Sequence, residues 1–205
     1  MTTCSFGPLT VQYDARVLVP RPWTLQQSEW AAELAGHAPA GPMLELCAGA
    51  GHIGQAAAVL AGRDLVQVER DPVAAGYARR NAADAGLNER VEVRQASLAD
   101  ALAPDEVFPL VLADPPYLPS AQVSRWPEDP VTAIDGGPDG LDVVRLCLRV
   151  AAAHLVPGGP LLLQVAGDAQ VDVMADVVTR DELPFAVTDV RRHDPERAVV
   201  LLRRA

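Results

Sequence analysis

Apolar runs of strand length recur through the middle of the chain, each long enough to cross a sheet once. They are rich in Leu, Val and Ala, and nearly continuous apolar character is typical of parallel strands buried on both faces. The runs lie at residues 43–47, 65–68, 91–93, 110–113 and 161–165. The pattern therefore predicts a parallel sheet covered by helices on both faces.

Helical patterns fill the intervals between these runs. Ala-rich stretches occupy residues 53–61 and 72–85, and a short crossover helix is expected near residues 98–102. A longer helix over residues 141–155 is predicted to end at the Pro-Gly-Gly sequence of residues 157–159. Strand and helix alternate in this way in folds built from βαβ units.

The two ends of the chain follow other patterns. Residues 186–190 and 198–202 are joined by a polar turn too short for a helix, which predicts an antiparallel hairpin. Residues 9–19 resemble a short extended pair, and a helix is expected from about residue 24 to residue 36, with Thr24 as its cap.

Together these elements predict an α/β fold. We expect a Rossmann-like, seven-stranded, mostly parallel sheet with helices on both faces and an antiparallel C-terminal edge hairpin. The prediction is a single domain over residues 1–205, in which residues 1–36 form an entrance segment and residues 41–205 form the core.

Composition agrees with one globular domain, because 49% of the 205 residues are hydrophobic and 21% are charged. The three cysteines provide no disulfide framework and no Cys-x-x-Cys knuckle, and the four histidines show no metal-ligand spacing, so no metal is expected. The N-terminus carries no basic-then-apolar leader, and no apolar run has membrane-spanning length. We therefore expect a cytoplasmic protein without a membrane partner.

Charge restricts the chemistry and the partners further. The net charge is −10, and all 17 cations are arginine because the chain contains no lysine, which excludes lysine chemistry. A net negative surface opposes approach to a phosphate backbone. A nucleic-acid partner is therefore disfavoured.

A glycine-rich turn follows the first apolar run and opens the next predicted helix. Its glycines have the spacing Gly49-x-Gly51-x-x-Gly54. We predict that Gly49 and Gly51 let the backbone pass close to a bound ligand and that Gly54 lets the helix pack tightly on the sheet. By itself this motif also suits a nicotinamide dinucleotide.

Two carboxylates near this turn favour S-adenosylmethionine over the dinucleotide. Glu45 precedes the glycines, where a pyrophosphate site is normally kept free of acids and where the cationic amino end of S-adenosylmethionine would be matched by one. Glu69 follows the next apolar run and is placed to accept both ribose hydroxyls, which fits either cofactor.

The sequence Asp114-Pro115-Pro116-Tyr117 ends the fourth apolar run. It resembles the [Asn/Asp]-Pro-Pro-[Tyr/Phe] motif of class I methyltransferases that modify amide or exocyclic amino nitrogens. Such a nitrogen is a poor nucleophile because its lone pair is delocalised. Asp114 and the Pro115 carbonyl are predicted to accept its two N–H groups, the prolines to stiffen the backbone, and Tyr117 to offer a flat face. Rate would then come chiefly from alignment.

Two further segments extend the resemblance. Residues 20–24, Pro-Arg-Pro-Trp-Thr, are similar to the Pro-Arg-Pro-x-Thr entrance of the protein-(glutamine-N5) methyltransferases, the HemK-like or release factor methyltransferase family. Residues 134–141, Ile-Asp-Gly-Gly-Pro-Asp-Gly-Leu, are similar to the Leu-Asp-Gly-Gly-x-Asp-Gly-Leu segment of that family. The similarity runs from about Phe6 to the C-terminus.

The chain departs from the family pattern in several places. Asp114 stands where Asn is usual, Trp23 where an acidic residue is usual, and Ser97 where an Asp commonly contacts adenine. The N-terminal helical substrate domain of the bacterial family has no counterpart in the sequence, so an activating partner or a homo-oligomer remains open. The resemblance implies a cofactor-binding set made of Glu45, Ala48, Gly49, Gly51, Glu69, Arg70, Ser97, Leu98 and Asp114.

Trp23, Tyr117 and Trp126 all fall in loops expected around the mouth of the site. We predict that the two tryptophans wall a substrate pocket; a place in the core is the alternative for both. His52 lies in the glycine turn with no nearby acid or nucleophile, which favours a loop side chain over a catalytic base.

The resulting hypothesis is an enzyme that uses S-adenosylmethionine to methylate a protein glutamine, with a translation factor among the candidate acceptors. The alternatives are an exocyclic amine of DNA or RNA, a small-molecule amine, and a non-catalytic binding subunit. The acidic net charge counts against the nucleic acid, and the intact motifs count against the binding subunit.

Overall fold

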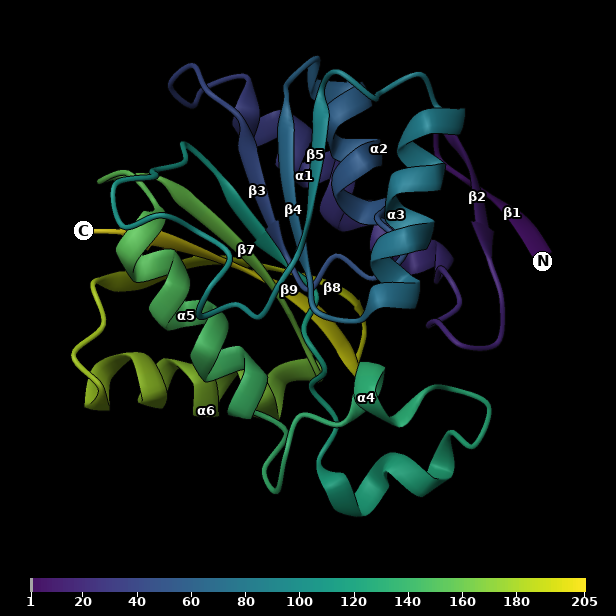
Figure 1. Cartoon of the computed structure of the whole chain (residues 1–205). Coiled ribbons are helices and arrows are strands. Elements are labelled where there is room, and N and C mark those ends of the chain that lie inside the picture. Colours follow the sequence, from purple (N-terminus) through teal and green to yellow (C-terminus); the bar gives the residue numbers. More distant parts are fainter. Residues whose placement is uncertain (1) are drawn as a thin grey trace.

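A seven-stranded mixed sheet forms the centre of the computed structural model, which describes residues 2–205 (Figure 1). The strand order is β5-β4-β3-β6-β7-β9-β8, with only β9 running antiparallel to its neighbours β7 and β8. The strands are β3 (Met43–Leu46), β4 (Leu65–Glu69), β5 (Val91–Gln95), β6 (Val111–Ala113), β7 (Pro160–Val165), β8 (Phe185–Asp194) and β9 (Arg197–Arg204). The predicted fold class, including the edge hairpin, is confirmed.

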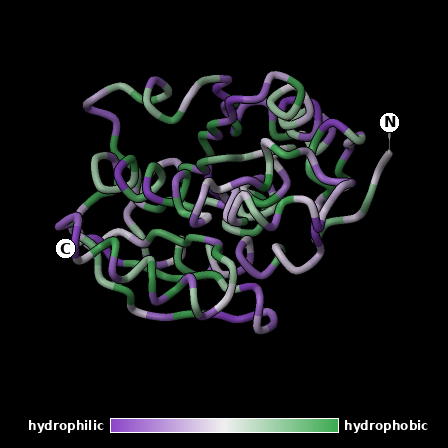
Figure 2. The backbone as a smooth tube through the Cα atoms, turned by 90° about the horizontal axis from the view of Figure 1, so that it is seen from below, coloured by the Kyte–Doolittle hydropathy of each residue, from purple (hydrophilic) through white to green (hydrophobic). Residues whose placement is uncertain are grey.

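Helices cover both faces of this sheet (Figure 1). One face carries α1 (Leu25–Ala35), α2 (His52–Ala61) and α3 (Pro72–Asp84), and the other carries α5 (Asp142–His154) and α6 (Gly167–Arg180). Every residue of β3, β4 and β7 is buried between these two layers. Figure 2 shows apolar segments, in green, alternating with polar ones along the backbone. The apolar character of these strands is expected when neither face of the sheet is exposed to solvent.

Local chemistry explains where the helices begin. The Asp71 carboxylate accepts the backbone N–H groups of Val73 and Ala74, both at 2.8 Å, and Pro72 occupies the first turn of α3. Gly51 precedes α2 in a left-handed conformation with φ of 85°. The chain can therefore turn sharply from β3 into α2.

Several predicted elements differ from those observed. Residues 98–102 form a turn and no helix, because the backbone already reverses between Ser97 and Asp100 and Pro104 follows soon after. The extended pair at the N-terminus comes earlier than expected, as β1 (Thr2–Phe6) and β2 (Leu9–Tyr13). Helix α6 was not predicted, although its buried residues Met174, Val177 and Val178 have helical spacing.

The expected cap of α1 is also wrong. A short 3-10 helix, η1 (Pro22–Thr24), runs directly into α1, so Thr24 is itself in a helical conformation. Its hydroxyl donates to the Arg21 carbonyl at 2.8 Å instead of accepting an N–H group of α1. Residues 22–24 of the entrance segment therefore continue into α1 without a break.

Two small helices, η2 (Ser120–Arg125) and α4 (Val131–Ile134), lie beyond the carboxyl end of β6. Figure 1 shows this segment projecting below the sheet, away from the other helices. Across residues 2–205, no helix combines the length and apolar character needed to cross a bilayer.

Candidate active site

The strand order creates a switch point between β3 and β6. From β3 the chain winds outward through β4 to β5 and then returns to place β6 on the other side of β3. In open α/β sheets, ligands bind outside the carboxyl ends of the strands at such a point. The last paired residues here are Leu46 and Ala113, so Cys47 and Asp114 leave the sheet side by side.

The glycine turn (residues 48–54) occupies the β3 side of this switch point. Gly49 has a φ of 56°, and a β-carbon added to it would meet no atom within 4 Å. The turn therefore borders open space at Gly49, as predicted for a backbone that a ligand approaches closely.

The other two glycines serve packing within the protein. A β-carbon on Gly51 would lie 2.4 Å from the Gln55 side chain and 3.0 Å from Ala78, so a side chain at this position would collide with α2 and α3. Close passage of the Gly51 backbone to a ligand stays a prediction. A β-carbon on Gly54 would lie 2.3 Å from Glu45 and 3.0 Å from Leu65, which confirms the predicted close packing of α2 on the sheet.

Glu45 supports the turn from beneath. Its side chain is 2% exposed and accepts the Gly54 N–H at 2.9 Å and a hydrogen bond from the Gln67 amide. Burial raises the pKa of Glu45 to about 8, and these two hydrogen bonds oppose the shift. Contact of Glu45 with a ligand, as expected from the sequence, stays a prediction.

Glu69 closes the same turn from the end of β4. Its carboxylate accepts the Gly49 N–H at 2.8 Å and the Asp71 N–H at 2.8 Å, so it links the turn to the start of α3. This carboxylate is fixed beside Gly49, where the backbone borders open space, and the two together fit the nucleoside part of a cofactor.

The other predicted cofactor residues surround this region. Ala48 is buried and donates its N–H to Val68, and Arg70 is exposed and donates to the Thr132 carbonyl of α4. Ser97 is exposed, with its hydroxyl donating to Asp100 at 2.6 Å, while Leu98 packs partly against the core. Ligand contact by these four residues stays a prediction.

Two cysteines that are far apart in the sequence meet behind the turn. The Sγ atoms of Cys47 and Cys147 lie 3.9 Å apart, and both thiols are free. Cys47 has a φ of 60°, a left-handed conformation that is uncommon outside glycine. Its thiol has a raised pKa, caused by the neighbouring Cys147 and by burial, which keeps it protonated.

The Pro-Pro loop (residues 114–117) occupies the β6 side of the switch point. None of residues 2–205 forms a hydrogen bond with the Asp114 carboxylate, and this carboxylate lines a cavity of about 580 Å³. Desolvation raises the pKa of Asp114 to about 7. Asp114 is thus an unpartnered acceptor held at the mouth of a cavity.

Residues 134–141, the Gly-Gly segment, pack directly against this loop. The Leu118 N–H donates to Ile134 at 3.0 Å, and the Gly136 N–H donates to Leu118 at 2.9 Å. A β-carbon on Gly136 would lie 2.7 Å from the Pro116 carbonyl oxygen, and one on Gly140 would lie 2.4 Å from that of Tyr117. Glycine is therefore required at both positions for the two segments to approach.

Both predicted tryptophans line the cavity, and neither belongs to the buried core. Trp126 is 36% exposed. Trp23 lies under the Arg197 guanidinium, whose central carbon is 3.8 Å from the ring centroid. The tip of the β8–β9 hairpin thus forms one wall of the cavity together with the entrance segment.

Sequence reasoning gave no contact to several residues that shape this cavity, although Arg21 stands in the Pro-Arg-Pro-x-Thr motif. The Arg21 Nη2 donates to both carboxylate oxygens of Asp129, at 2.6 and 2.7 Å, which ties the entrance segment to the segment between η2 and α4. Arg197 and Gln170 also line it. These contacts join segments up to 108 residues apart, and no local pattern signals them.

His52 is the first residue of α2 and a buried packing residue, and not the loop side chain expected from the sequence. It is 8% exposed, and its ring meets Phe6 edge-on at 4.7 Å, which anchors the N-terminal hairpin on α2. Burial lowers its pKa to about 4, so the ring is neutral near pH 7. Within residues 2–205, no cluster of three His, Cys, Asp or Glu side chains has a geometry that could hold a metal ion.

Comparison with known proteins points to methyl transfer. The family model described as "Conserved hypothetical protein 95" matches residues 29–126. A release factor glutamine methyltransferase from Gloeobacter violaceus is 33% identical over 92% of this chain and 68% of its own length. A ribosomal protein uL3 glutamine methyltransferase from Bradyrhizobium diazoefficiens is 35% identical over 74% of this chain and 51% of its own length. The chain thus spans between half and somewhat over two thirds of these two relatives.

Solved structures show the same fold at lower identity. The catalytic domain of hMettl16, solved with a hairpin of the MAT2A 3'UTR, superposes with a TM-score of 0.75 at 14% identity, covering 97% of this chain and 76% of that one. At this identity the likeness concerns the fold alone. It supports the Rossmann-like arrangement of the sheet and helices described above.

Proposed function

Because this chain belongs to the family of the release factor glutamine methyltransferases, we propose that it is an S-adenosylmethionine-dependent enzyme that methylates a glutamine side chain of a protein. Relatives named for release factors and for ribosomal protein uL3 make a component of the translation machinery the first acceptor to test. The three free cysteines suit a reducing cytoplasm as the place of the reaction.

The cofactor would lie along the glycine turn. Glu69 would accept the ribose hydroxyls, and the backbone at Ala48 and Gly49 would line the nucleoside, because the open space at Gly49 gives it room. When bound, S-adenosylmethionine supplies an electrophilic methyl group. The neighbouring strand end then presents the acceptor from the β6 side of the switch point.

One observation carries the proposal: Asp114 is an acceptor without a protein partner, set at a cavity beside two prolines. An amide NH2 group has two N–H donors, which Asp114 and the Pro115 carbonyl would accept. Pro115 and Pro116 have no N–H of their own, so their backbone has no donor with which to compete for these oxygens.

The remaining groups orient the acceptor. The partly buried Tyr117 ring would lie against the planar amide, while its raised pKa, caused mainly by burial, keeps the hydroxyl protonated. Alignment of a poor nucleophile can contribute roughly 7 to 11 kcal/mol to lowering a barrier. After transfer, the nitrogen can shed its extra proton to water.

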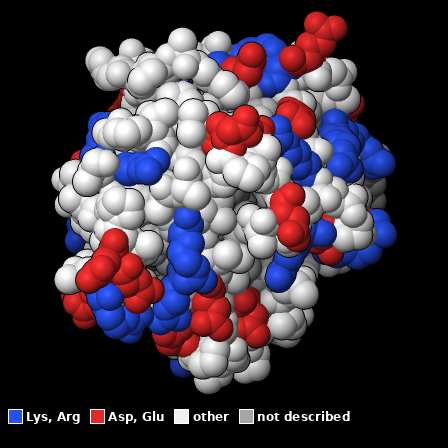
Figure 3. Space-filling view, turned by 60° about the vertical axis from the view of Figure 1, so that its left-hand side comes forward, with Lys and Arg blue, Asp and Glu red and all other residues white. Residues whose placement is uncertain are grey.

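The acceptor class can be tested directly. The protein is incubated with methyl-labelled S-adenosylmethionine and, separately, purified release factor, uL3, total RNA and a small-molecule fraction. We expect label in protein and a glutamine heavier by one methyl group in the peptide mass spectrum. Label confined to RNA or to small molecules would contradict the proposed acceptor while leaving methyl transfer intact. A protein acceptor is favoured over RNA by the surface in Figure 3, where acidic and basic side chains are interspersed and form no continuous basic patch on the face shown.

A further inference from the structure

The Pro-Pro loop has few ways of holding its own shape. Strand pairing of β6 ends at Ala113, and the two prolines that follow Asp114 carry no N–H donor. Besides the contacts of Leu118 with the Gly-Gly segment, the carbonyl groups at the two ends of the loop are groups by which the rest of the protein can fix it. Both of these carbonyls are bound by the side-chain amide of a buried glutamine.

At the first end, Gln27 of α1 reaches across the sheet. Its Nε2 donates to the Ala113 carbonyl at 3.0 Å and to the Leu162 carbonyl of β7 at 3.2 Å, and the side chain is fully buried. The next residue, Ser28, donates to the Ile53 carbonyl at 2.8 Å. Helix α1 is thus anchored both to α2 and to the residue immediately before Asp114.

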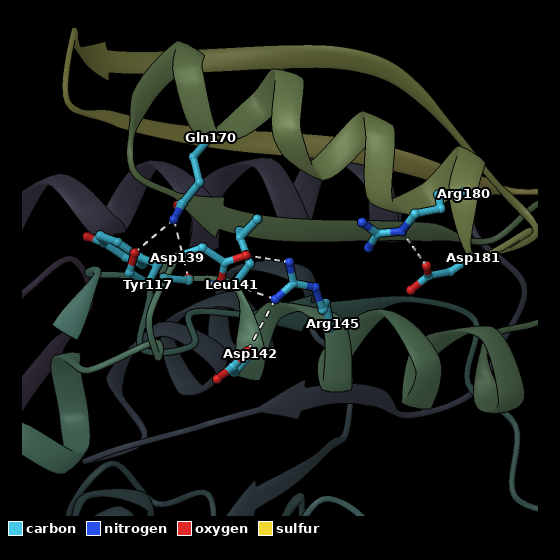
Figure 4. A network of polar contacts seen from close by, with 9 residues as sticks. Tyr117, Asp139, Leu141, Asp142, Arg145, Gln170, Arg180 and Asp181 are labelled. Atoms are coloured by element: carbon cyan, nitrogen blue, oxygen red, sulfur yellow. Dashed lines mark hydrogen bonds and ion pairs between the residues drawn. The ribbon is translucent and has the colours of Figure 1, made fainter.

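At the second end, Gln170 of α6 makes the corresponding contacts. Its Nε2 donates to the Tyr117 carbonyl at 2.8 Å and to the Gly140 carbonyl at 3.3 Å, while its Oε1 accepts the Ala166 N–H at 2.7 Å. Figure 4 shows this side chain descending from α6 to the backbone beside Tyr117 and Leu141. The missing side chain of Gly140 leaves room for it, since a β-carbon there would lie 2.8 Å from Nε2.

The Gly-Gly segment that Gln170 contacts is itself bound to α5 through Arg145. Arg145 binds Asp139 and Asp142, and the Asp139 carboxylate also accepts the Leu141 N–H at 3.0 Å (Figure 4). Gln170 therefore links the end of the Pro-Pro loop to the Gly-Gly segment, which is in turn bound to α5. Each glutamine uses both of its N–H groups on two carbonyls, one from the loop end and one from a neighbouring element.

We propose that Gln27 and Gln170 are positioning residues that fix the two ends of the Pro-Pro loop and thereby aim its acceptor oxygens at the substrate amide. This inference rests on the proposed function of the site. Displacement of a reacting group by about 1 Å can cost about 100-fold in rate, so loss of either clamp should be visible in the chemical step.

The test uses the full chain and the variants Gln27→Met, Gln170→Met and Gln170→Glu, with Gln12→Met on β2 as the matched control. Glutamate keeps an oxygen for the Ala166 N–H but no donor for the Tyr117 carbonyl. A role limited to the start of α6 would therefore spare Gln170→Glu. Loop positioning predicts that it is impaired like Gln170→Met.

Three quantities are measured. Hydrogen exchange of peptides spanning residues 113–122 and 134–141 needs no substrate, calorimetry with S-adenosylhomocysteine reports the cofactor half, and single-turnover methylation reports the chemistry. We expect faster exchange in these peptides and turnover about 10- to 100-fold slower, with little change in cofactor affinity. The Gln12→Met protein should match the wild type.

Unchanged exchange and turnover in both Gln27→Met and Gln170→Met would overturn the proposal. If Gln170→Met does not fold, Gln27→Met at the opposite end and Gln170→Glu decide the question. A wild-type protein that transfers no methyl group, combined with faster loop exchange in the variants, would remove the proposed function and leave the positioning role standing.

Discussion

The two sides of the switch point are built in opposite ways. The glycine turn follows directly on β3, and its carboxylates Glu45 and Glu69 both accept backbone N–H groups. The Pro-Pro loop depends on segments that are far apart in the chain, and its carboxylate, Asp114, is left without a partner. The carboxylates of the side proposed to bind the cofactor already have hydrogen-bond partners within the protein. The carboxylate of the side proposed to act on the acceptor has none, so it is free to accept a hydrogen bond from the substrate.

The pKa values of Glu45 in β3 and of Asp114 after β6 show the same contrast. Burial raises the pKa of Glu45 to about 8 and that of Asp114 to about 7. Glu45 keeps its hydrogen bonds and supports the backbone, while Asp114 faces the cavity. The raised pKa of Glu45 therefore bears on the structure of the glycine turn, whereas the raised pKa of Asp114 bears on the chemistry of the proposed site.

Removing the free acceptor should have the largest effect. We expect Asp114→Ala to lower single-turnover methylation by about 100- to 1,000-fold, the usual cost of removing one aligned hydrogen-bonding group from a reacting centre. Asp114→Asn retains an oxygen acceptor and should keep substantial activity, with cofactor affinity in both variants close to that of the wild type by calorimetry. Full activity in Asp114→Ala would remove this loop from the proposed site, and equal failure of Asn and Ala would make Asp114 a base.

Substitution on the glycine-turn side of the switch point should have a smaller effect, and the effect should be on cofactor affinity. Glu69→Ala removes the acceptor for Gly49 and the predicted ribose contact, and should weaken S-adenosylhomocysteine binding about 10- to 100-fold, as expected for hydrogen bonds to a charged group. Glu89→Ala, at an exposed position, is the control. Unchanged affinity in Glu69→Ala would exclude this residue from the cofactor site.

The pH dependence of turnover should distinguish the two carboxyl groups. Below about pH 7 Asp114 becomes protonated and is then a weaker, neutral acceptor, so the rate should fall as pH falls and level off near the rate of Asp114→Asn. Asp114→Asn should flatten this profile. If the pH dependence of the rate is instead lost in Glu45→Gln, the titrating group is Glu45 beneath the glycine turn.

Stability should follow the opposite direction with pH. Both carboxyl groups have pKa values raised above their ordinary values in the folded state, so the folded protein binds more protons than the unfolded chain. The free energy of unfolding should therefore decrease as pH rises from about 4 to about 8 through these two groups. Urea melts of Glu45→Gln across this range should show a shallower decrease than those of the wild type.

The smallest effect is expected at the rim of the cavity. Trp126 lines the cavity and is 36% exposed, so Trp126→Ala should raise the acceptor KM about three- to tenfold and leave kcat nearly unchanged. Thermal melting should be close to that of the wild type. Global unfolding of the variant would instead indicate that the side chain is needed by the fold.

The sequence predicted the fold and the two motifs because both depend on local patterns. Strand-length apolar runs and the glycine spacing describe residues that lie near one another in the chain. It did not predict the close approach of Ala78, on a different helix, to Gly51, where a β-carbon would also meet the Gln55 side chain. Nor did it predict Gln27 or Gln170, because a glutamine in a helix has no periodic or motif signal for the distant carbonyl it will bind.

The position of β9 in the sheet also has a consequence for the order of folding. β8 pairs only with β9, and β9 lies between β7 and β8, so β8 reaches the sheet only as part of the hairpin. The β3–β4–β5 portion grows by successive pairing of neighbouring segments, whereas docking of the hairpin on β7 closes a loop that contains α6. Because the hairpin tip brings Arg197 over Trp23, we expect the wall of the cavity to form late in refolding, after the glycine turn is in place.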